Sequence, residues 1–246
     1  MLKITSGVRS VVRGLTSSAG RNATARVAPL QEAALEERCI LVDEFDKPLG
    51  DATKRHCHRI SEDGEIPLHR AFSVFLFDSK GDLLLQKRSA SKITFPGYYT
   101  NTCCSHPLTE VPGESEEGDA LGIRRAARRR LAYELGIPVS EIQPEDFFYV
   151  TRIHYQAMGH DDVWGEHEID YVLFLKKNKI TLDPNPDEVS EIKWISKKNI
   201  EEFASNCESP LTPWFELILN HKLPLWWDNL ECLERVQDHR TIQRFV

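Results

Sequence analysis

The amino-acid sequence predicts a single α/β (α+β) domain in which a mixed β-sheet is sandwiched between helices. Short apolar runs bounded by turn residues recur along the chain, and most follow one another closely enough to be joined as hairpins. One long stretch instead has its apolar residues at helical spacing. No linker composition interrupts residues 39–246, so these elements belong to one domain.

The first half of the chain is expected to be mainly β. Apolar or β-branched runs that end at Gly, Pro, Asp or Ser are typical of strands. The turn residues at 78–82 join two such runs in a hairpin, and those at 46–50 lead from the first run into a further strand. Residues 31–38 are expected to be helical or irregular. The runs predict strands at residues 39–43, 71–77, 83–88 and 99–104.

The second half of the chain adds one long helix. Leu121, Leu131 and Leu135 recur at helical spacing over residues 119–135, and Gly136 is the residue type that ends a helix at that point. The remaining patterns predict strands at 147–157, 168–175 and 191–195, a helix at 197–204, and a helical tail at 213–246.

Charge and cysteine content exclude several classes of protein. The 246 residues carry a net charge of −7, and because residues 1–31 hold five basic residues and no acidic one, −12 falls on the remainder. An acidic body argues against a nucleic-acid partner. No run approaches the roughly 18 uninterrupted apolar residues of a membrane span, so no membrane partner is expected. The six cysteines form no C-x-x-C pair and are expected to be free thiols.

The first 31 residues have the composition of a targeting segment. They are rich in Ser, Thr, Ala and Arg, and the first acidic residue is Glu32. This composition favours an organellar transit peptide and a mitochondrial location. An extension without a targeting role is the alternative, and the protein would then lie in the cytosol or the peroxisome. The chain ends Arg244-Phe245-Val246, which is not a peroxisomal signal of the Ser-Lys-Leu type.

Three histidines are candidate metal ligands. His58 and His69 flank a polar loop, and His106 follows the β-prone run that ends in two cysteines. Neutral imidazole is a common ligand of divalent metals. A surface or hydrogen-bonded role is the ordinary alternative for each of them.

A group of carboxylates supplies further candidate ligands. Glu166, Glu168 and Asp170 alternate along a predicted strand and therefore share one face. Three carboxylates on one face repel each other unless water solvates them or a cation joins them. A mixed His/Glu site suits Zn, Mn or Mg, whereas a solvated outer face is the other interpretation.

The adjacent cysteines contain a candidate for acid–base chemistry. On an extended chain Cys104 and His106 face the same side. A nearby cation would lower the pKa of the thiol and burial would raise it, so either a thiolate base or a thiol acid is possible. Cys103 suits the role of a small buried apolar residue.

Basic and aromatic side chains complete the candidate site. Arg88 and Lys92 lie around the exit of the predicted hairpin, and Lys54 precedes His58 by four residues. Such donors bind phosphate groups, although most arginines of the 119–135 helix are expected to form a solvated face. Trp214 and Tyr155 could form the wall of a pocket and stabilise a cation, with core packing as the ordinary alternative.

Several of these motifs together resemble type I isopentenyl-diphosphate isomerases. The resemblance rests on residues 101–107 (Asn-Thr-Cys-Cys-Ser-His-Pro), 164–170 (Trp-Gly-Glu-His-Glu-Ile-Asp) and 212–214 (Thr-Pro-Trp). Residues 68–73 and 91–97 are similar too. The resemblance runs from about Ile40 to near the C-terminus.

The resemblance implies a Nudix-like fold with a degenerate Nudix box. In the box of hydrolytic Nudix enzymes, acidic residues gather metal ions. Here Tyr133-Glu134 stands in place of the paired acids of the box, and Arg129-Arg130 stands in place of its Arg-Glu. Loss of most of the acids speaks against diphosphate hydrolysis. The implied organisation is an extension at 1–31, an N-terminal segment with short strands at 32–66, a Nudix-like catalytic domain at 67–219 and a helical tail at 220–246.

The implied reaction is the interconversion of isopentenyl and dimethylallyl diphosphate in isoprenoid and sterol precursor biosynthesis. It is a metal-dependent 1,3-allylic proton shift through a tertiary carbocation, and it needs an acid and a base on opposite faces of the substrate. The resemblance gives these roles to Cys104 and Glu168. It assigns Trp214 and Tyr155 to the carbocation wall, and Tyr155 also to proton transfer.

The resemblance also implies two metal ions and a diphosphate site. One divalent ion (Zn, Mn or Mg) is held by His58, His69, His106, Glu166 and Glu168, and His58 is preferred to His56 by its spacing from Lys54. A second ion, Mg2+, bridges Glu134 and the diphosphate. His167 and Asp170 receive no role. The implied diphosphate-binding residues are Lys54, Arg88, Lys92, Ser105 and Arg130.

Two other functions are weighed against this one. A Nudix-type diphosphate hydrolase would need the acid-rich box that is absent. A binding protein that has lost catalysis would lack some of the cysteine, glutamate or histidines, and all are present. The expected partner is a small diphosphate substrate, and a monomer is expected because no heptad or apolar surface stripe is evident.

Overall fold

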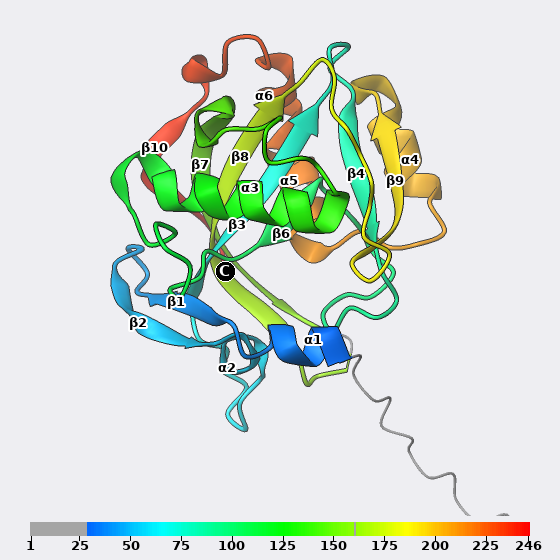
Figure 1. Cartoon of the computed structure of the whole chain (residues 1–246). Coiled ribbons are helices and arrows are strands. Elements are labelled where there is room, and N and C mark those ends of the chain that lie inside the picture. The colour runs from blue at the N-terminus through cyan, green and yellow to red at the C-terminus, as the bar shows by residue number, and fades with distance from the viewer. Residues whose placement is uncertain (1–28, 160) are drawn as a thin grey trace, which may run out of the picture.

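The computed structural model describes residues 29–159 and 161–246 (Figure 1). Residues 1–28 of the predicted targeting extension lie outside the described residues. The boundary predicted at residue 31 is too late, because residues 29–31 form the first turn of helix α1 (Pro29–Ala34) and Gln31 is buried.

The described chain contains the predicted mixture of helices and strands. It begins with α1 and continues with β1 (Arg38–Val42), β2 (Pro48–Thr53), α2 (Lys54–His58), β3 (His69–Phe77), β4 (Leu83–Arg88), β5 (Tyr99–Thr100), β6 (Cys103–Ser105), α3 (Leu121–Leu135), β7 (Phe147–Met158), β8 (Gly165–Lys176), β9 (Val189–Ile195), α4 (Ile200–Asn206), α5 (Pro213–His221), α6 (Leu223–Asp228) and β10 (Asp238–Phe245).

The strands form one mixed sheet, as predicted. Its main path is β10-β7-β8-β3-β1-β2, with β3 parallel to β8 and β10 parallel to β7. β4 meets β3 only at Phe77↔Leu83, then diverges to pair with β5 and β9. The hairpin predicted at 71–77 and 83–88 therefore exists at its turn alone, because each strand has other partners further along.

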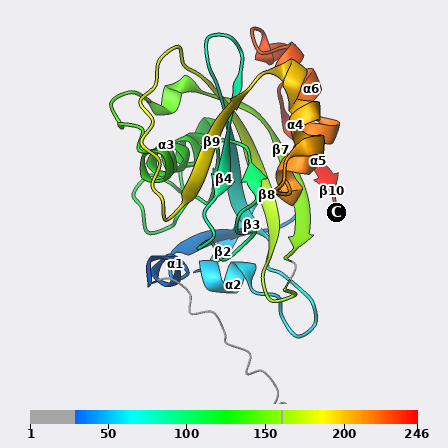
Figure 2. The ribbon, with the colours of Figure 1, turned by 90° about the vertical axis from the view of Figure 1, so that its right-hand side faces the viewer.

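Helices cover both faces of the sheet. Figure 2 shows α3 on one side and α4, α5 and α6 on the other. Successive side chains of β3 pack on opposite faces of the sheet. Val74 and Leu76 are in the cluster with α3, and Phe75 and Phe77 are in the cluster with α5 and α6. Both faces of β3 are buried, which explains why its sequence is an apolar run and not an alternating one.

Helix α3 confirms the helix predicted at 119–135. Apolar residues such as Leu131 and Leu135 turn toward the sheet and are fully buried. Gly136 ends the helix with φ of 64°, a left-handed conformation that glycine adopts freely. A Cβ at this position would also lie 2.2 Å from the carbonyl oxygen of Asp183, so no other residue fits.

Helix α2 is absent from the sequence prediction. Its five residues are too few for a periodic pattern, and its start is marked only by the Thr53 hydroxyl, which accepts a hydrogen bond from the backbone N–H of His56 at 3.3 Å. One helical turn separates Lys54 from His58. The turn leaves His56 exposed and buries His58 against β8.

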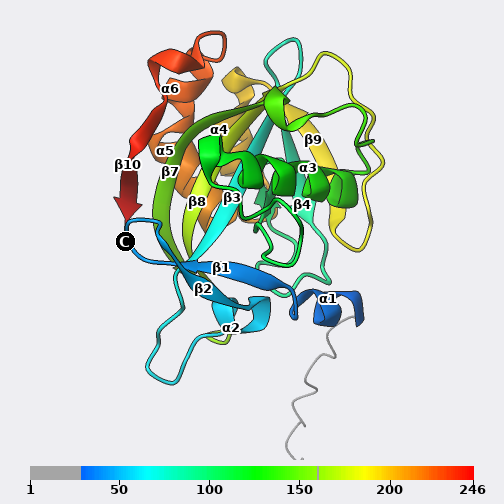
Figure 3. The same cartoon turned by 60° about the vertical axis from the view of Figure 1, so that its left-hand side comes forward.

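The helical tail predicted at 220–246 is wrong beyond α6. Residues of β10 pair in parallel with β7, including Ile242↔Arg152 and Phe245↔Tyr155, and β10 lies at the edge of the sheet (Figure 3). An edge strand is half exposed and its sequence is mostly polar, so it has no apolar pattern that distinguishes it from a helix.

The β-prone run at 99–104 is divided between two neighbours. β5 pairs with β4, whereas β6 pairs with β3 and places Cys104 opposite Ser73. The run thus bridges the gap where β3 and β4 separate. Within the described residues, no helix has the length and apolar character needed to cross a membrane.

Candidate active site

A cavity of about 370 Å³ opens between α1, α2, β6, β8 and the start of α5. Two predicted site residues stand just behind its wall: His69 lies beside Glu168, and Glu134 is bonded to Arg130. The other predicted site residues line the cavity: Lys54, His58, Arg88, Lys92, Cys104, Ser105, His106, Arg130, Tyr155, Glu166, Glu168 and Trp214. The fold therefore gathers the predicted residues from across the chain.

The predicted metal ligands form one compact buried group. One ligand atom from each of the five lies within 4.8 Å of the others. α2, the start of β3, the segment after β6 and strand β8 supply these atoms. The group consists of His58, His69, His106, Glu166 and Glu168.

Hydrogen bonds to the backbone orient two of the three imidazole rings. His58 Nδ1 donates to Lys54 O at 2.8 Å, and His69 Nδ1 donates to Pro67 O at 2.9 Å. Each ring consequently turns its Nε2 atom toward the centre of the group. A backbone acceptor on the other nitrogen is the usual arrangement of a metal-ligating histidine.

The group has more ligand capacity than its own contacts use. His69 Nε2 and Glu166 Oε2 are buried and make no hydrogen bond to any other described residue. Buried polar atoms without partners are costly, and a divalent cation at the centre would satisfy them. Three imidazoles and two carboxylates suit a divalent metal of intermediate hardness, so the residues fit the implied metal.

The pKa values of the group also favour a bound cation. Burial lowers the pKa of His69, but the charge of Glu168, whose Oε1 lies 3.5 Å from His69 Nε2, raises it to about 9. Burial raises the pKa of Glu168, but the nearby His69 brings it below its ordinary value. Burial and the charge of Lys54 keep the pKa of His106 well below its ordinary value. The group therefore attracts one positive charge and rejects a second proton.

Cys104 lies in a polar niche beside this group. Its thiol donates to Asn101 Oδ1 at 3.0 Å, its sulfur accepts from Trp214 Nε1 at 2.9 Å, and Ser73 Oγ lies at 3.3 Å. Burial and the charge of Asp170 raise the pKa of the Cys104 thiol well above its usual range. Burial therefore favours the protonated thiol over the thiolate.

Glu168 offers a carboxylate to the same cavity. Its Oε2 accepts a hydrogen bond from Tyr155 Oη at 2.5 Å, and its Oε1 lies 2.9 Å from His106 Nε2. Burial and the Glu168 charge raise the pKa of Tyr155, so its hydroxyl stays a proton donor. The Tyr155 and Trp214 rings are 6.3 Å apart between centroids and form an aromatic wall between acid and carboxylate.

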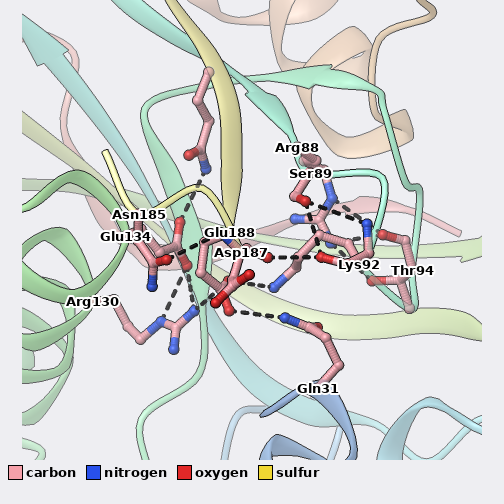
Figure 4. A network of polar contacts seen from close by, with 12 residues as sticks. Gln31, Arg88, Ser89, Lys92, Thr94, Arg130, Glu134, Asn185, Asp187 and Glu188 are labelled. Atoms are coloured by element: carbon pink, nitrogen blue, oxygen red, sulfur yellow. Dashed lines mark hydrogen bonds and ion pairs between the residues drawn. The ribbon is translucent and has the colours of Figure 1, made fainter. Parts of the chain in front are cut away.

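A network of ion pairs occupies the opposite end of the cavity (Figure 4). Arg130 binds Glu134 through two hydrogen bonds of 2.5 and 3.1 Å and reaches Glu188 at 3.2 Å. Lys92 Nζ contacts the same Glu188 oxygen at 2.6 Å, and Gln31 donates to its other oxygen at 3.0 Å. Each charge in this network already has a partner.

The network shifts the pKa values of its members. Burial raises the pKa of Glu134, but the charges of Arg130 and Lys92 outweigh burial and lower this pKa to about 2. Burial, aided by the nearby Arg88 cation, lowers the pKa of Lys92 to about 8. Lys92 is therefore charged at neutral pH but loses its charge in mildly basic solution.

The remaining predicted diphosphate ligands frame the entrance. Arg88 donates to the carbonyl oxygens of Thr94 and Phe95 and holds its guanidinium 5.7 Å from the centre of the Trp214 ring. Lys54 and Ser105 face the cavity from α2 and the end of β6. These cations make the entrance positive, which favours an anionic group.

Sequence reasoning missed several residues of the site. Glu188 lies in a Pro- and Asn-rich turn, and its sequence neighbours give no sign that it meets Lys92 and Arg130. Asn101 stands within the 101–107 motif that predicts Cys104, so its position did carry a signal. Asp170 accepts a hydrogen bond from Ser73 at 2.7 Å and so belongs to the surroundings of the thiol.

A family comparison supports this geometry. The model of the NUDIX domain matches residues 67–215. Two solved structures share the fold: one from Deinococcus radiodurans (18% identity, 76% of this chain and 99% of that chain, TM-score 0.53) and a NUDIX hydrolase from Alicyclobacillus acidocaldarius (9%, 72% and 97%, TM-score 0.51).

Curated relatives are much more similar in sequence. A protein of Bos taurus named Isopentenyl-diphosphate Delta-isomerase 1 is 52% identical over 217 residues, 87% of this chain and 94% of its own. Its namesake in Mesocricetus auratus is 51% identical over 224 residues, 90% and 97% of the two chains. A Gibberella zeae protein with an isopentenyl-diphosphate delta-isomerase name is 46% identical, covering 85% and 83%.

Proposed function

The chain belongs to the isopentenyl-diphosphate Delta-isomerase family of the Nudix superfamily, and we propose that it interconverts isopentenyl and dimethylallyl diphosphate. The reaction moves one proton onto the substrate and removes another two carbons away. It neither adds water nor cleaves a phosphate bond. The degenerate Nudix box and the relatives' names favour this reaction over diphosphate hydrolysis.

One observation carries the proposal. The buried thiol of Cys104 and the buried carboxylate of Glu168 line the same cavity, which is of a size for a small branched substrate. An allylic proton shift needs a proton donor and a proton acceptor in one water-poor space. A hydrolase would instead have to position and activate a water molecule.

The thiol supplies the proton in the direction from isopentenyl to dimethylallyl diphosphate. Cys104 protonates the terminal carbon of the double bond, and positive charge develops on the tertiary carbon. The faces of Trp214 and Tyr155 stabilise this charge. The carboxylate of Glu168 then removes a proton from the far side. In the reverse direction the two residues exchange roles.

The thiolate that remains after the first step is stabilised by hydrogen-bond donors that are already in position. Trp214 Nε1 already points at the sulfur, and the Ser73 hydroxyl lies within reach. Tyr155 similarly holds Glu168 in place through its short hydrogen bond. Donors that are in position before the charge appears lower the barrier because they need no reorganisation.

We also propose a divalent metal in the histidine and glutamate group. His58, His69, His106, Glu166 and Glu168 would hold it, and Mn, Zn or Mg fits this donor set. When bound, the ion fixes the Glu168 carboxylate and balances the negative charge around it.

The diphosphate is proposed to bind at the ion-pair end. Lys54, Arg88, Lys92 and Arg130 provide positive charge there, with Ser105 as a neutral donor. Glu134, which lies just behind the cavity wall, is the residue proposed to help hold a Mg2+ ion, which would neutralise the charge of the diphosphate. The alkene then lies between Cys104 and Glu168, because the two ends of the cavity are continuous.

The proposal is tested by following the reaction in deuterated water. Purified protein with isopentenyl diphosphate and Mg2+ should give dimethylallyl diphosphate that carries deuterium, measured by NMR. The variants Cys104→Ala and Glu168→Gln should each lose roughly 10²–10⁴-fold in kcat. Cys103→Ala is the matched control, since Cys103 is fully buried in the core and should keep near-wild-type kcat. Release of phosphate, or full activity of Cys104→Ala, would contradict the proposal.

The extension before the described residues is proposed to target the protein to the mitochondrion, on the strength of its basic composition. The folded protein is proposed to act as a monomer. Fusing residues 1–31 to a fluorescent protein tests the first point, and light scattering at micromolar concentration tests the second.

A further inference from the structure

Two further histidines, outside the group of metal ligands, lie in contact with each other. His154 on β7 and His167 on β8 stack with ring centroids 5.1 Å apart, and their Nε2 atoms are 2.9 Å apart. Side chains alternate across a strand, so His167 points away from the face that carries Glu166 and Glu168. The proposed chemistry uses neither member of the pair.

The direction of every hydrogen bond in this region is fixed by one arginine. Arg244 of β10 places Nη1 2.9 Å from His154 Nδ1, and a guanidinium can only donate. His154 Nδ1 must therefore accept, which puts the single proton of the neutral ring on Nε2. Burial, together with His167 and Arg244, keeps the pKa of His154 at about 4, so the ring is neutral under ordinary conditions.

The same logic continues through the second ring. Because His154 Nε2 donates, His167 Nε2 accepts, and the proton of His167 lies on Nδ1. That nitrogen is 2.7 Å from the carbonyl oxygen of Ile66, which can only accept. Three hydrogen bonds thus run in one direction, from β10 through β7 and β8 into the loop before β3.

The chain of hydrogen bonds ends next to a metal ligand. Ile66 is followed by Pro67, whose carbonyl oxygen accepts from Nδ1 of His69 at 2.9 Å. The fixed φ of proline removes one of the two backbone rotations that separate these carbonyl groups. The position of Ile66 O therefore restricts the position of Pro67 O, and Pro67 O holds the ring of His69 through Nδ1.

We infer that His154 and His167 are positioning residues that hold the Ile66-Pro67 peptide and thereby aim His69 at the metal. The inference rests on the proposed metal centre. Partners that orient metal ligands commonly change metal affinity by 10–100-fold when they are lost. An effect at the lower end, about tenfold, is expected because His154 acts through His167 and the peptide.

The experiment compares two substitutions of the same residue. Metal-free His154→Leu and His154→Gln proteins are titrated with Mn2+ by calorimetry, with no substrate present. His154→Leu should bind Mn2+ about tenfold more weakly than the wild type. His154→Gln should stay within about threefold, because an amide offers both an acceptor and a donor. His239→Leu is the control: this histidine also lies at the β7–β10 boundary, but it bonds Tyr149 O and leads to no metal ligand.

The possible outcomes separate the two proposals. A wild type that binds no Mn2+ would remove the metal centre itself. A wild type and His154→Leu that bind Mn2+ equally would overturn only the positioning role. The tautomers provide a test that needs no variant and no metal: ¹⁵N NMR should find the proton of His154 on Nε2 and that of His167 on Nδ1. The opposite tautomer of either ring would overturn the inference.

Discussion

The two ends of the cavity are both buried but balance their charges differently. We call them the histidine half (His58, His69, His106, Glu166 and Glu168) and the arginine half (Gln31, Lys92, Arg130, Glu134 and Glu188). In the histidine half, two buried ligand atoms, His69 Nε2 and Glu166 Oε2, lack a hydrogen bond among the described residues. In the arginine half, each charged group is bonded to an opposite charge.

This difference indicates how each half meets its ligand. A cation in the histidine half would satisfy the buried atoms that have no hydrogen bond, and would take the place of the His58–Glu166 and His106–Glu168 contacts. The arginine half must exchange existing ion pairs for those of the incoming anion. A site that already has internal partners binds its ligand less tightly and releases it more readily, which suits a substrate and its product.

The largest expected effect tests the histidine half. His58→Ala should weaken Mn2+ binding by more than about 100-fold, because it removes a direct ligand and such losses exceed those of orienting partners. His56→Ala is the matched control, since His56 is two residues away and exposed. Calorimetric titration measures both. Equal affinities for the two variants would mean that the group is not the metal centre.

The next effect tests whether Glu188 substitutes for an anion in the arginine half. Glu188→Gln leaves Lys92 and Arg130 with less negative charge, and should lower the free energy of unfolding by about 2 kcal/mol. Saturating pyrophosphate with Mg2+ should reduce that deficit to below about 1 kcal/mol, because the anion replaces the lost charge.

Denaturant unfolding with and without pyrophosphate measures this difference. Glu191→Gln is the control, since Glu191 also pairs with a lysine, Lys193, but lies outside the cavity. If the Glu188→Gln deficit is the same with and without pyrophosphate, the anion does not bind where the arginine half is.

The smallest effect concerns pH. Lys92 has a pKa of about 8 in the folded protein, below its ordinary value of 10.5, because burial and Arg88 disfavour its charge. kcat/KM should therefore fall above about pH 8, by up to about tenfold per pH unit, as the free enzyme loses this cation.

The same ionisation changes stability in the opposite direction to kcat/KM. The unfolded chain binds more protons than the folded one between pH 8 and 10.5, so this group makes the fold more stable as pH rises through that range. Lys92→Arg should abolish the fall in kcat/KM, because arginine stays charged. A fall that persists unchanged in Lys92→Arg would assign it to another group. Steady-state kinetics across pH 7–10 separates these outcomes.

The sequence anticipated elements whose signals are local. The spacing of Leu131 and Leu135 and the stop at Gly136 identify α3 without knowledge of its neighbours. The apolar run of β3 likewise contains its own evidence. α2 and β10 were missed because a five-residue helix has no period and a polar edge strand has no apolar face.

The site divides in a similar way. Residues in compact motifs, such as Cys104 and Glu168, could be selected from the sequence by chemistry and resemblance. Glu188 and His154 could not, because their roles arise from partners far along the chain: Arg130 and Lys92 for one, Arg244 and His167 for the other. Contacts of this kind depend on strand register, which local patterns do not determine.

The parallel pairing of β3 with β8 has a consequence for how the protein folds. It places His69 directly opposite Glu168, so two metal ligands meet only when distant parts of the chain have already joined. Pairing of distant segments is slow, because the entropy lost in closing a long loop precedes the contacts that reward it. A metal ion held by these residues would therefore bind a nearly finished protein, and would slow unfolding rather than speed folding.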